Sequence, residues 1–75
     1  MNQQKRLIEL GKLIRERRLN AGMTQQELGT ESGYDATYIS MLERGRRNPP
    51  FLTLCTITRH LGVPLHKLLK QFEDE

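Results

Sequence analysis

The sequence lacks the features that mark membrane proteins, secreted domains and disulfide-stabilised folds. It contains one cysteine in 75 residues, so no intrachain disulfide can form and a reducing compartment is expected. No apolar run approaches the roughly 20 residues of a membrane span, and the opening MNQQKR has no apolar signal region. These absences predict a cytoplasmic protein that does not associate with a membrane.

Residue patterns for catalysis and metal binding are lacking as well. His60 and His66 have no pair of cysteine or carboxylate ligands at metal-binding spacing, so no metal site is expected. Cys55 has no evident base and is interpreted as a small core or surface residue. Because no glycine-rich phosphate loop or catalytic triad pattern occurs, the sequence predicts no catalytic residue, no cofactor and no small-molecule effector.

Chain length and helical periodicity set the fold class. A chain of 75 residues without repeats or linkers predicts a single domain over residues 1–75. A domain of this size buries only about 60% of its unfolded surface, so its stability is expected to be low and dimerisation would increase it. No segment shows the strict alternation of a strand, and apolar residues recur at helical spacing. The predicted fold class is therefore all-α.

Residues 24–45, TQQELGTESGYDATYISMLERG, predict two short helices joined by a glycine turn. Thr24 and Glu27 have the spacing of a capping box that begins a helix. Gly33 is expected to end that helix, because glycine takes the left-handed conformation without steric cost. Asp35 then caps the second helix. Two helices with such a tight turn form a helix-turn-helix unit.

Small and apolar residues predict how these two helices pack. Gly29 falls on the inner face, where a side chain would push apart helices that must cross closely. Leu28, Ile39 and Leu42 are expected to hold the crossing through apolar contacts. Gly45 is expected to end the second helix.

Three further helices are predicted around this unit. The first covers about residues 3–20, and its apolar stripe is formed by Leu7, Leu10, Leu13, Ile14 and Ala21. Gly11 interrupts it at a cost of about 1 kcal/mol relative to alanine, so its first turns are expected to fray. The fourth covers about residues 51–61, with an inward face of Leu54, Ile57, Thr58 and Leu61. The fifth has Pro64 in its first turn and carries Leu65, Leu68, Leu69 and Phe72.

Beyond the motif, nearly the whole chain from about Leu10 resembles one family. The segments IRERRLNAGMTQ, YISMLERG and LGVPLHKLL, in this order, resemble the Cro/repressor-type (lambda-repressor-like, XRE) helix-turn-helix transcription regulators. The string TYISMLERGRRNP is most similar to controller proteins of restriction-modification systems and related small dimeric repressors. The resemblance implies a compact five-helix DNA-binding domain with the helix-turn-helix at helices 2 and 3.

This resemblance implies a surface that reads DNA sequence. In helix-turn-helix proteins the second helix of the motif enters the major groove with its N-terminal residues toward the base edges. The corresponding residues here are Ala36, Thr37, Ser40 and Met41. Thr37 can hydrogen-bond a base or contact a thymine methyl, whereas Ala36 offers apolar contact alone. Arg44 and DNA shape are therefore expected to add to recognition. The alternative for Thr37 and Ser40 is ordinary solvent-facing polarity.

Other residues are predicted to contact the DNA backbone. Gln25 lies at the start of the motif's first helix, which the family points at phosphate groups. The loop residues Arg46, Arg47 and Asn48 suit charge-assisted contacts that position the protein without reading sequence. Tyr38 is expected at the helix edge, where its hydroxyl would reach a phosphate.

Three residues near this surface are expected to be structural. The family pairs an arginine late in the first helix with a glutamate near the end of the recognition helix, and Arg18 and Glu43 match these positions. The resemblance thus predicts a partly buried ion pair that fixes the helix angle, with little net stability because desolvation offsets attraction. Tyr34, in the turn, matches the apolar residue that covers the core in the family.

The charge distribution is consistent with a polyanionic partner. The net charge is +3, and it is +6 without Glu73, Asp74 and Glu75, because 12 basic residues then face 6 acidic ones. The arginines cluster at residues 15–18 and 44–47. A soluble basic domain with solvated charges is the alternative interpretation.

Two functions from different classes fit these patterns. The first is sequence-specific binding of double-stranded DNA by a homodimeric repressor or autoregulator on a near-palindromic operator. The second is a protein-interaction adaptor or antitoxin-like module with weak or no base reading, which Ala36 and the acidic C-terminus favour. For the dimer, Leu69 and Phe72 are predicted at the interface while Leu65 and Leu68 close the core. The alternative is a monomer with all four residues in its core.

Overall fold

Five α-helices follow one another along the chain, and residues 2–72, which the computed structural model describes, contain no strand. Only the backbone of Phe72 is described. The helices are α1 (Gln3–Asn20), α2 (Gln25–Ser32), α3 (Ala36–Glu43), α4 (Phe51–Leu61) and α5 (Leu65–Leu69), followed by a 3-10 turn over Lys70–Phe72. The all-α prediction and the predicted order of helices are confirmed.

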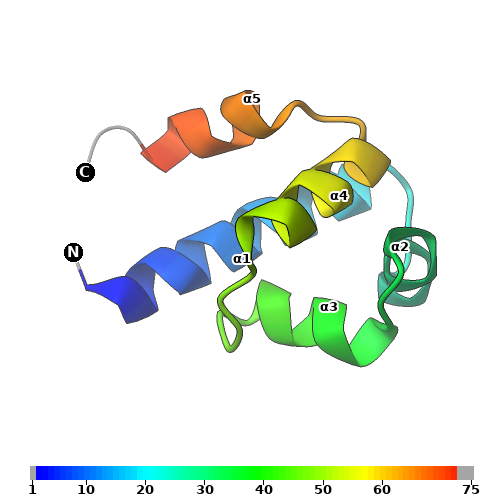
Figure 1. Ribbon diagram of the computed structural model, residues 1–75, viewed down its shortest axis with the longest axis horizontal. Helices are drawn as coiled ribbons and strands as arrows, with labels where there is room; N and C mark the ends of the chain where they lie inside the picture. The colour runs from blue at the N-terminus through cyan, green and yellow to red at the C-terminus, as the bar shows by residue number, and fades with distance from the viewer. Residues whose placement is uncertain (1, 73–75) are drawn as a thin grey trace.

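The helices surround one apolar core. In Figure 1, α4 lies in front of α1 along the middle of the view, with α3 along one edge and α5 along the opposite edge. The buried residues between them are Ile14, Leu28, Ile39, Leu42, Leu54, Ile57, Leu61, Val63 and Leu68. The inward residues predicted for α4 are all buried, as are those predicted to hold the crossing of α2 and α3.

Gly11 permits a close approach of α1 and α3. The helix α1 is continuous through this residue, so the predicted interruption is absent. Gly11 is buried, and a Cβ atom there would clash with the carbonyl oxygens of Leu42 and Glu43 at the end of α3. Helix propensity reflects only the cost of glycine within its own helix and does not include this packing against α3.

The ends of α1 are set by local contacts. Asn2 caps its start, because the Asn2 side chain accepts a hydrogen bond from the Lys5 backbone N–H at 2.8 Å. Ala21, which was placed on the apolar stripe, is exposed. That prediction is wrong because the helix ends at Asn20 and Gly22 follows with a positive φ of 72°.

The helix-turn-helix unit has the capping geometry that the sequence predicts. The Thr24 hydroxyl accepts a hydrogen bond from the Glu27 backbone at 3.0 Å, and the Glu27 carboxylate accepts one from the Thr24 backbone at 2.8 Å. Gly33 ends α2 with φ at 85°, where a residue with a side chain is strained. Asp35 begins α3 by accepting a hydrogen bond from the Tyr38 backbone at 2.8 Å.

The helix α5 is short. Pro64 precedes it as the N-cap residue, and the α-helix ends at Leu69. Leu68 is fully buried and Leu65 packs partly against the core, whereas Leu69 is 39% exposed. Within residues 2–72, no helix combines the length and the hydropathy that crossing a bilayer requires.

Candidate nucleic-acid interface

The helix α3 has one buried face and one accessible face. Its buried residues are Ile39, Leu42 and Glu43. All four residues predicted to face base edges keep accessible surface: Thr37 is exposed, and Ala36, Ser40 and Met41 are half-buried. The helix is therefore fixed to the core on one side and offers short polar and apolar side chains on the other.

Glu43, at the end of α3, is held from α1. Arg18 Nε donates to Glu43 Oε2 at 2.6 Å, and Arg18 Nη2 donates to Glu43 Oε1 at 3.0 Å. The two side chains are 8% and 2% exposed, so the pair is buried more deeply than the sequence indicated. Arg18 Nη1 also donates to the Met23 carbonyl at 2.8 Å.

The contacts of Arg18 favour its charged form. The hydrogen bond to Glu43 raises the pKa of Arg18, burial opposes that rise, and the negative charge of Glu43 adds to it. The guanidinium stays charged and remains committed to Glu43 and Met23. The Arg18 guanidinium therefore holds the end of α3 in place, and it does not add to the basic surface of the loop after α3.

Gln25 makes a contact within the chain that sequence reasoning missed. Its Nε2 donates to Glu43 Oε1 at 3.1 Å. Gln25 is the first residue of α2 and is half-buried, so its amide joins the start of α2 to the ion pair. In this structure the residue predicted to touch phosphate also ties α2 to the end of α3.

Two tyrosines and an arginine form a stack at the edge of α3. The rings of Tyr34 and Tyr38 have centroids 4.7 Å apart and planes inclined by 24°. The guanidinium carbon of Arg47 lies 5.3 Å from the centroid of the Tyr38 ring, within the range of a cation–π contact. Burial raises the pKa of the Tyr38 hydroxyl, Tyr34 adds to that rise, and Arg47 opposes it.

Tyr34 connects this stack to α4. The hydroxyl oxygens of Tyr34 and Thr53 are 2.7 Å apart, in hydrogen-bond contact. Because Tyr34 is 39% exposed, its main contacts are with Tyr38 and Thr53, and the expected role as a cover for the core does not describe it. Tyr34 lies in the turn before the Asp35 N-cap, so the helical rule for residues four positions apart does not apply to it and gave no signal for the stack.

The segment after α3 is basic and accessible. Its predicted DNA-backbone residues Arg46, Arg47 and Asn48 are exposed, as is Arg44. The Arg46 backbone N–H donates to the Met41 carbonyl at 2.8 Å, which fixes the start of the segment to α3. The Arg44 side chain donates from Nε to the Ser40 carbonyl at 3.3 Å, so it is directed back along α3.

Leu69 faces an open groove between α5 and the first half of α1. The groove has a volume of about 580 Å³, and its lining residues are Gln3, Arg6, Leu7, Leu10, Asn48 and Leu69. Asn48 therefore lines this groove, whereas Arg46 and Arg47, with which it was predicted to contact the DNA backbone, are not among the lining residues. Phe72, the other predicted dimer residue, has a side chain outside the described part of the chain.

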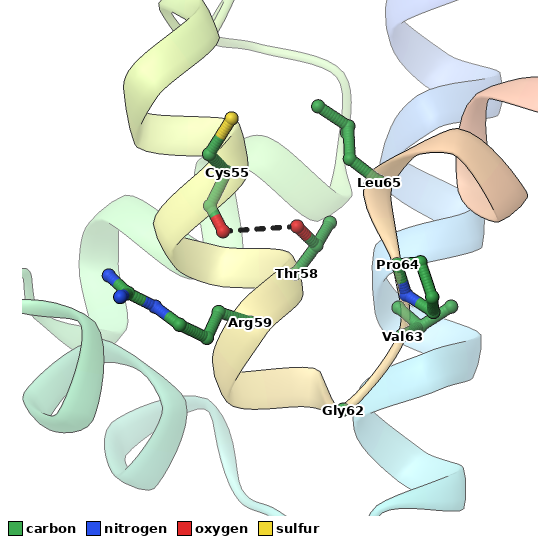
Figure 2. Close-up of a pocket in the computed structure, with 7 residues that line it drawn as sticks. All are labelled: Cys55, Thr58, Arg59, Gly62, Val63, Pro64 and Leu65. Carbon is green, nitrogen blue, oxygen red and sulfur yellow. Dashed lines mark hydrogen bonds between the residues drawn. The ribbon is translucent and has the colours of Figure 1, made fainter.

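A second groove, of about 400 Å³, lies between α4 and the connection to α5 (Figure 2). Its lining residues are Cys55, Thr58, Arg59, Gly62, Val63, Pro64 and Leu65. The Thr58 hydroxyl donates within its own helix, to the carbonyls of Leu54 and Cys55 at 3.0 and 3.1 Å. These lining residues include no histidine or carboxylate that could act as a base on the Cys55 thiol.

Metal ligands do not gather in the part of the chain that the structure describes. Residues 2–72 contain no group of three or more side chains that could hold a metal ion. His60 lies 3.7 Å from the carboxylate of Glu31 and links α4 to α2. One imidazole and one carboxylate are fewer ligands than a structural zinc site uses.

Comparison with known proteins places the chain among helix-turn-helix proteins. Residues 14–68 match the protein-family model described as Helix-turn-helix. An uncharacterized HTH-type transcriptional regulator from Sinorhizobium fredii is 48% identical over 46 residues, which are 61% of this chain and 60% of that protein. The chain thus spans about three-fifths of that relative, and about half the length of two further curated regulators that it matches.

Two similar proteins are controllers of about the same size as this chain. The control protein C.MunI from Mycoplasma is 31% identical over 64 residues, which cover 85% of this chain and 86% of that protein. The crystal structure of the restriction-modification controller protein C.AhdI from Aeromonas hydrophila aligns with a TM-score of 0.82 and 30% identity. That alignment covers 85% of this chain and 97% of C.AhdI.

Proposed function

The chain belongs to the helix-turn-helix family, and on that premise we propose that it binds double-stranded DNA and regulates transcription. The observation that carries this proposal is the accessible face of α3. Its inner face is fixed by core residues and by Glu43, while Thr37 is exposed at its N-terminal end and the arginines at residues 44–47 follow its C-terminal end. Short side chains beside fixed cations suit a major groove with phosphates at its rims.

In the proposed complex, α3 enters the major groove. Thr37 contacts a base edge, Ser40 and Met41 follow one turn later, and Ala36 contacts a thymine methyl group. Because Ala36, Thr37 and Ser40 have short side chains and Met41 has no hydrogen-bond donor, direct readout involves few base pairs, and the sequence-dependent shape of the duplex contributes to specificity. Arg44 follows the last residue of α3, and its longer side chain supplies hydrogen-bond donors that can reach further into the groove.

Contacts to the DNA backbone flank this helix. Arg46 and Arg47 neutralise phosphates next to the groove that α3 occupies, and the Tyr38 hydroxyl contacts a phosphate from the helix edge. The backbone N–H groups at the start of α2 point to the other rim, where Gln25 lies. These contacts set the position of the protein without reading sequence.

The proposed binding unit is a homodimer on a near-palindromic operator. Leu69 is 39% exposed and lines a groove with Leu7 and Leu10, so a second copy would remove apolar surface from water on both subunits. A two-fold axis makes such a contact isologous. It also explains why a short recognition helix suffices, since two copies read two half-sites. The similarity to controller proteins of restriction-modification systems supports autoregulation or repression as the output.

Selection from a pool of random duplexes tests the proposal. The protein is incubated with the pool at fixed ionic strength, bound duplexes are recovered and sequenced over several rounds, and a Thr37→Ala variant is carried in parallel. We expect enrichment of a two-fold symmetric site with half-sites one helical turn apart. Recovery of duplexes without any shared sequence would contradict sequence-specific regulation.

A protein-interaction role is the second candidate, and one observation favours it. Phe51 and Leu52, at the start of α4, are 66% and 75% exposed, which is unusual for large apolar residues next to one another. A docking partner would cover these two residues. The short side chain of Ala36 fits this function, because a helix that reads no bases needs no long polar residue there. If the selection enriches no sequence while Phe51→Ser abolishes binding to a cellular protein, this second function replaces the first.

A further inference from the structure

Tyr34 contacts α3, which carries the proposed base contacts, and α4, which follows the segment with the proposed phosphate contacts. Its ring lies on Tyr38 of α3 at a centroid distance of 4.7 Å, and its hydroxyl contacts the Thr53 hydroxyl of α4 at 2.7 Å. The segment that carries Arg46 and Arg47 runs between α3 and α4. Tyr34 therefore contacts both helices that flank the basic segment, α3 before it and α4 after it.

The stack continues from Tyr38 to Arg47. The guanidinium of Arg47 lies over the Tyr38 ring at 5.3 Å, on an exposed side chain that would otherwise sample many rotamers. The start of this segment is already fixed, because the Arg46 backbone donates to the Met41 carbonyl at 2.8 Å. Tyr34 lies against Tyr38, and Arg47 lies over the Tyr38 ring, so these contacts limit where the cation can lie relative to α3.

The core does not account for Tyr34. The residue is 39% exposed, while the residues that form the apolar core are less than a tenth exposed. Its backbone N–H donates to the Gly29 carbonyl at 2.7 Å, a contact that any residue except proline could make. The aromatic ring and the hydroxyl therefore make contacts with Tyr38 and Thr53 that lie outside the apolar core.

We propose that Tyr34 is a positioning residue for DNA binding, which holds Tyr38 and, through its ring, Arg47 in the arrangement that contacts the phosphate backbone beside α3. This inference rests on the proposed function. An arginine that is already oriented loses less conformational freedom when it binds a phosphate, so orientation increases affinity without adding a contact. The same arrangement keeps a fixed distance between the phosphate that Arg47 contacts and the base that Thr37 contacts.

Three substitutions separate the ring from the hydroxyl. Tyr34→Ala removes both, Tyr34→Phe keeps the ring and loses the contact to Thr53, and Thr53→Val removes the partner hydroxyl while nearly preserving shape. Leu52→Ala, on the exposed surface beside Thr53, is the matched control. Circular dichroism and thermal unfolding of each variant ensure that binding is measured well below its unfolding temperature.

Binding is measured on the enriched duplex from the selection and on a shuffled duplex, over a series of salt concentrations. We expect Tyr34→Ala to weaken binding to both duplexes by roughly 3- to 10-fold, the size of effect that one aromatic pair supplies. The slope of log affinity against log salt should flatten by up to about 0.9, the value for one lost phosphate contact. Tyr34→Phe, Thr53→Val and Leu52→Ala should each change affinity by less than about threefold, because the stack persists.

A double-mutant cycle with Arg47→Ala distinguishes positioning from general support. In the Arg47→Ala background, Tyr34→Ala should leave the salt slope unchanged and affinity within about twofold, since only the uncharged Tyr38 is then left for Tyr34 to position. Equal losses in both backgrounds, or a lower unfolding temperature with an unchanged salt slope, would overturn the positioning role while leaving DNA binding intact. Wild-type protein that binds neither duplex would overturn the proposed function itself.

Discussion

The guanidinium of Arg18 and the carboxylate of Glu43 are joined by two hydrogen bonds of 2.6 and 3.0 Å, although 25 residues separate them in the chain. The pair connects the last turn of α1 to the last residue of α3. Because Gln25 donates to the same carboxylate at 3.1 Å, three helices converge on one acidic group. The angle of α3 is thus set at its end by charge and along its length by apolar packing.

Removing one member of this pair should be costly. We expect Glu43→Ala to lower the free energy of unfolding by about 3–5 kcal/mol, because it leaves the Arg18 guanidinium buried without a counter-charge. Urea denaturation followed by circular dichroism measures the change. Gln25→Ala is the milder comparison and should cost about 1 kcal/mol, the value of a hydrogen bond in a partly accessible place. A loss below about 1 kcal/mol for Glu43→Ala would show that water reaches the pair.

Replacing both members by apolar residues tests whether the ion pair itself stabilises the fold. Arg18→Met with Glu43→Leu should cost much less than Glu43→Ala alone, since no charge is left in the core. The Met23 carbonyl loses its donor in this variant, so some destabilisation remains. If the double variant is stable yet loses sequence-specific DNA binding, the ion pair contributes to the orientation of α3 more than to stability.

Gly11→Ala should destabilise the protein even though alanine is the better helix former. Propensity alone favours the variant by about 1 kcal/mol, but the added methyl group would meet the carbonyl oxygens of Leu42 and Glu43. We expect a net loss of about 1–3 kcal/mol, the range for overpacking. Lys12→Ala, on the exposed side of the same helix, is the control and should change stability by less than about 0.5 kcal/mol. A more stable Gly11→Ala variant would show that α1 can move away from α3.

Features that depend on a few neighbouring residues could be predicted from the sequence. The capping box at Thr24, the left-handed turn at Gly33 and the cap at Asp35 each depend on a short segment whose chemistry is visible in the chain. The inward face of α4 was likewise predictable, because apolar residues recur there at helical spacing. The order and number of helices follow from these local features.

Features that depend on distant surfaces could not be predicted in this way. The buried role of Gly11 exists because α3 crosses α1 at that point, and the contact of Gln25 with Glu43 exists because α2 begins beside the ion pair. The stack of Tyr34, Tyr38 and Arg47 needs a turn and a basic segment to meet at one edge. Periodicity and propensity describe one element at a time, so they contain no information on contacts between elements.

Tyr38 should titrate above its ordinary pKa of 10.0, because burial disfavours the phenolate. The chain has two tyrosines and no tryptophan, so the ultraviolet absorbance of phenolate reports on this stack alone. We expect a component above pH 10 that Tyr38→Phe removes. Arg47→Ala should move that component to still higher pH, because Arg47 lowers the pKa of Tyr38; an unchanged component would show that the cation does not lie over the ring.

The raised pKa of Tyr38 also makes part of the folding stability depend on pH. A raised pKa in the folded state means that the folded protein binds this proton more tightly than the unfolded chain does. The contribution of Tyr38 is therefore fully present below the pKa of the unfolded chain and is lost as pH rises through the higher folded value. Wild type should lose more stability than Tyr38→Phe between neutral pH and that alkaline range.

Thr37→Ala should weaken binding to the selected site by about 1–3 kcal/mol, the range for one good base contact, and change binding to shuffled DNA little. Equal losses on both duplexes would instead make Thr37 a backbone contact. Ala36→Arg should redirect the selection, because a long cationic side chain at this place on α3 reaches a guanine edge. Recovery of the same site from that variant would contradict the proposed orientation of α3 in the groove.

The dimer prediction depends on Leu69, whose exposed surface lies in the groove that also contains Leu7 and Leu10. Introducing charge there, in Leu69→Glu with Phe72→Glu, should abolish association, because two carboxylates per subunit would be buried against apolar surface. Sedimentation at micromolar concentration should show a dimer for wild type and a monomer for the variant. Lys67→Glu, on an exposed residue of the same helix, controls for the change in net charge.

Binding to DNA extends this test to the spacing of the two recognition helices. A two-fold dimer must place them about 34 Å apart to reach successive turns of one face of the duplex. The monomeric variant should therefore bind a single half-site as wild type does and lose the added affinity for the complete operator. A variant that still sediments as a dimer would place the interface elsewhere, and wild type that is monomeric even on its operator would contradict dimerisation altogether.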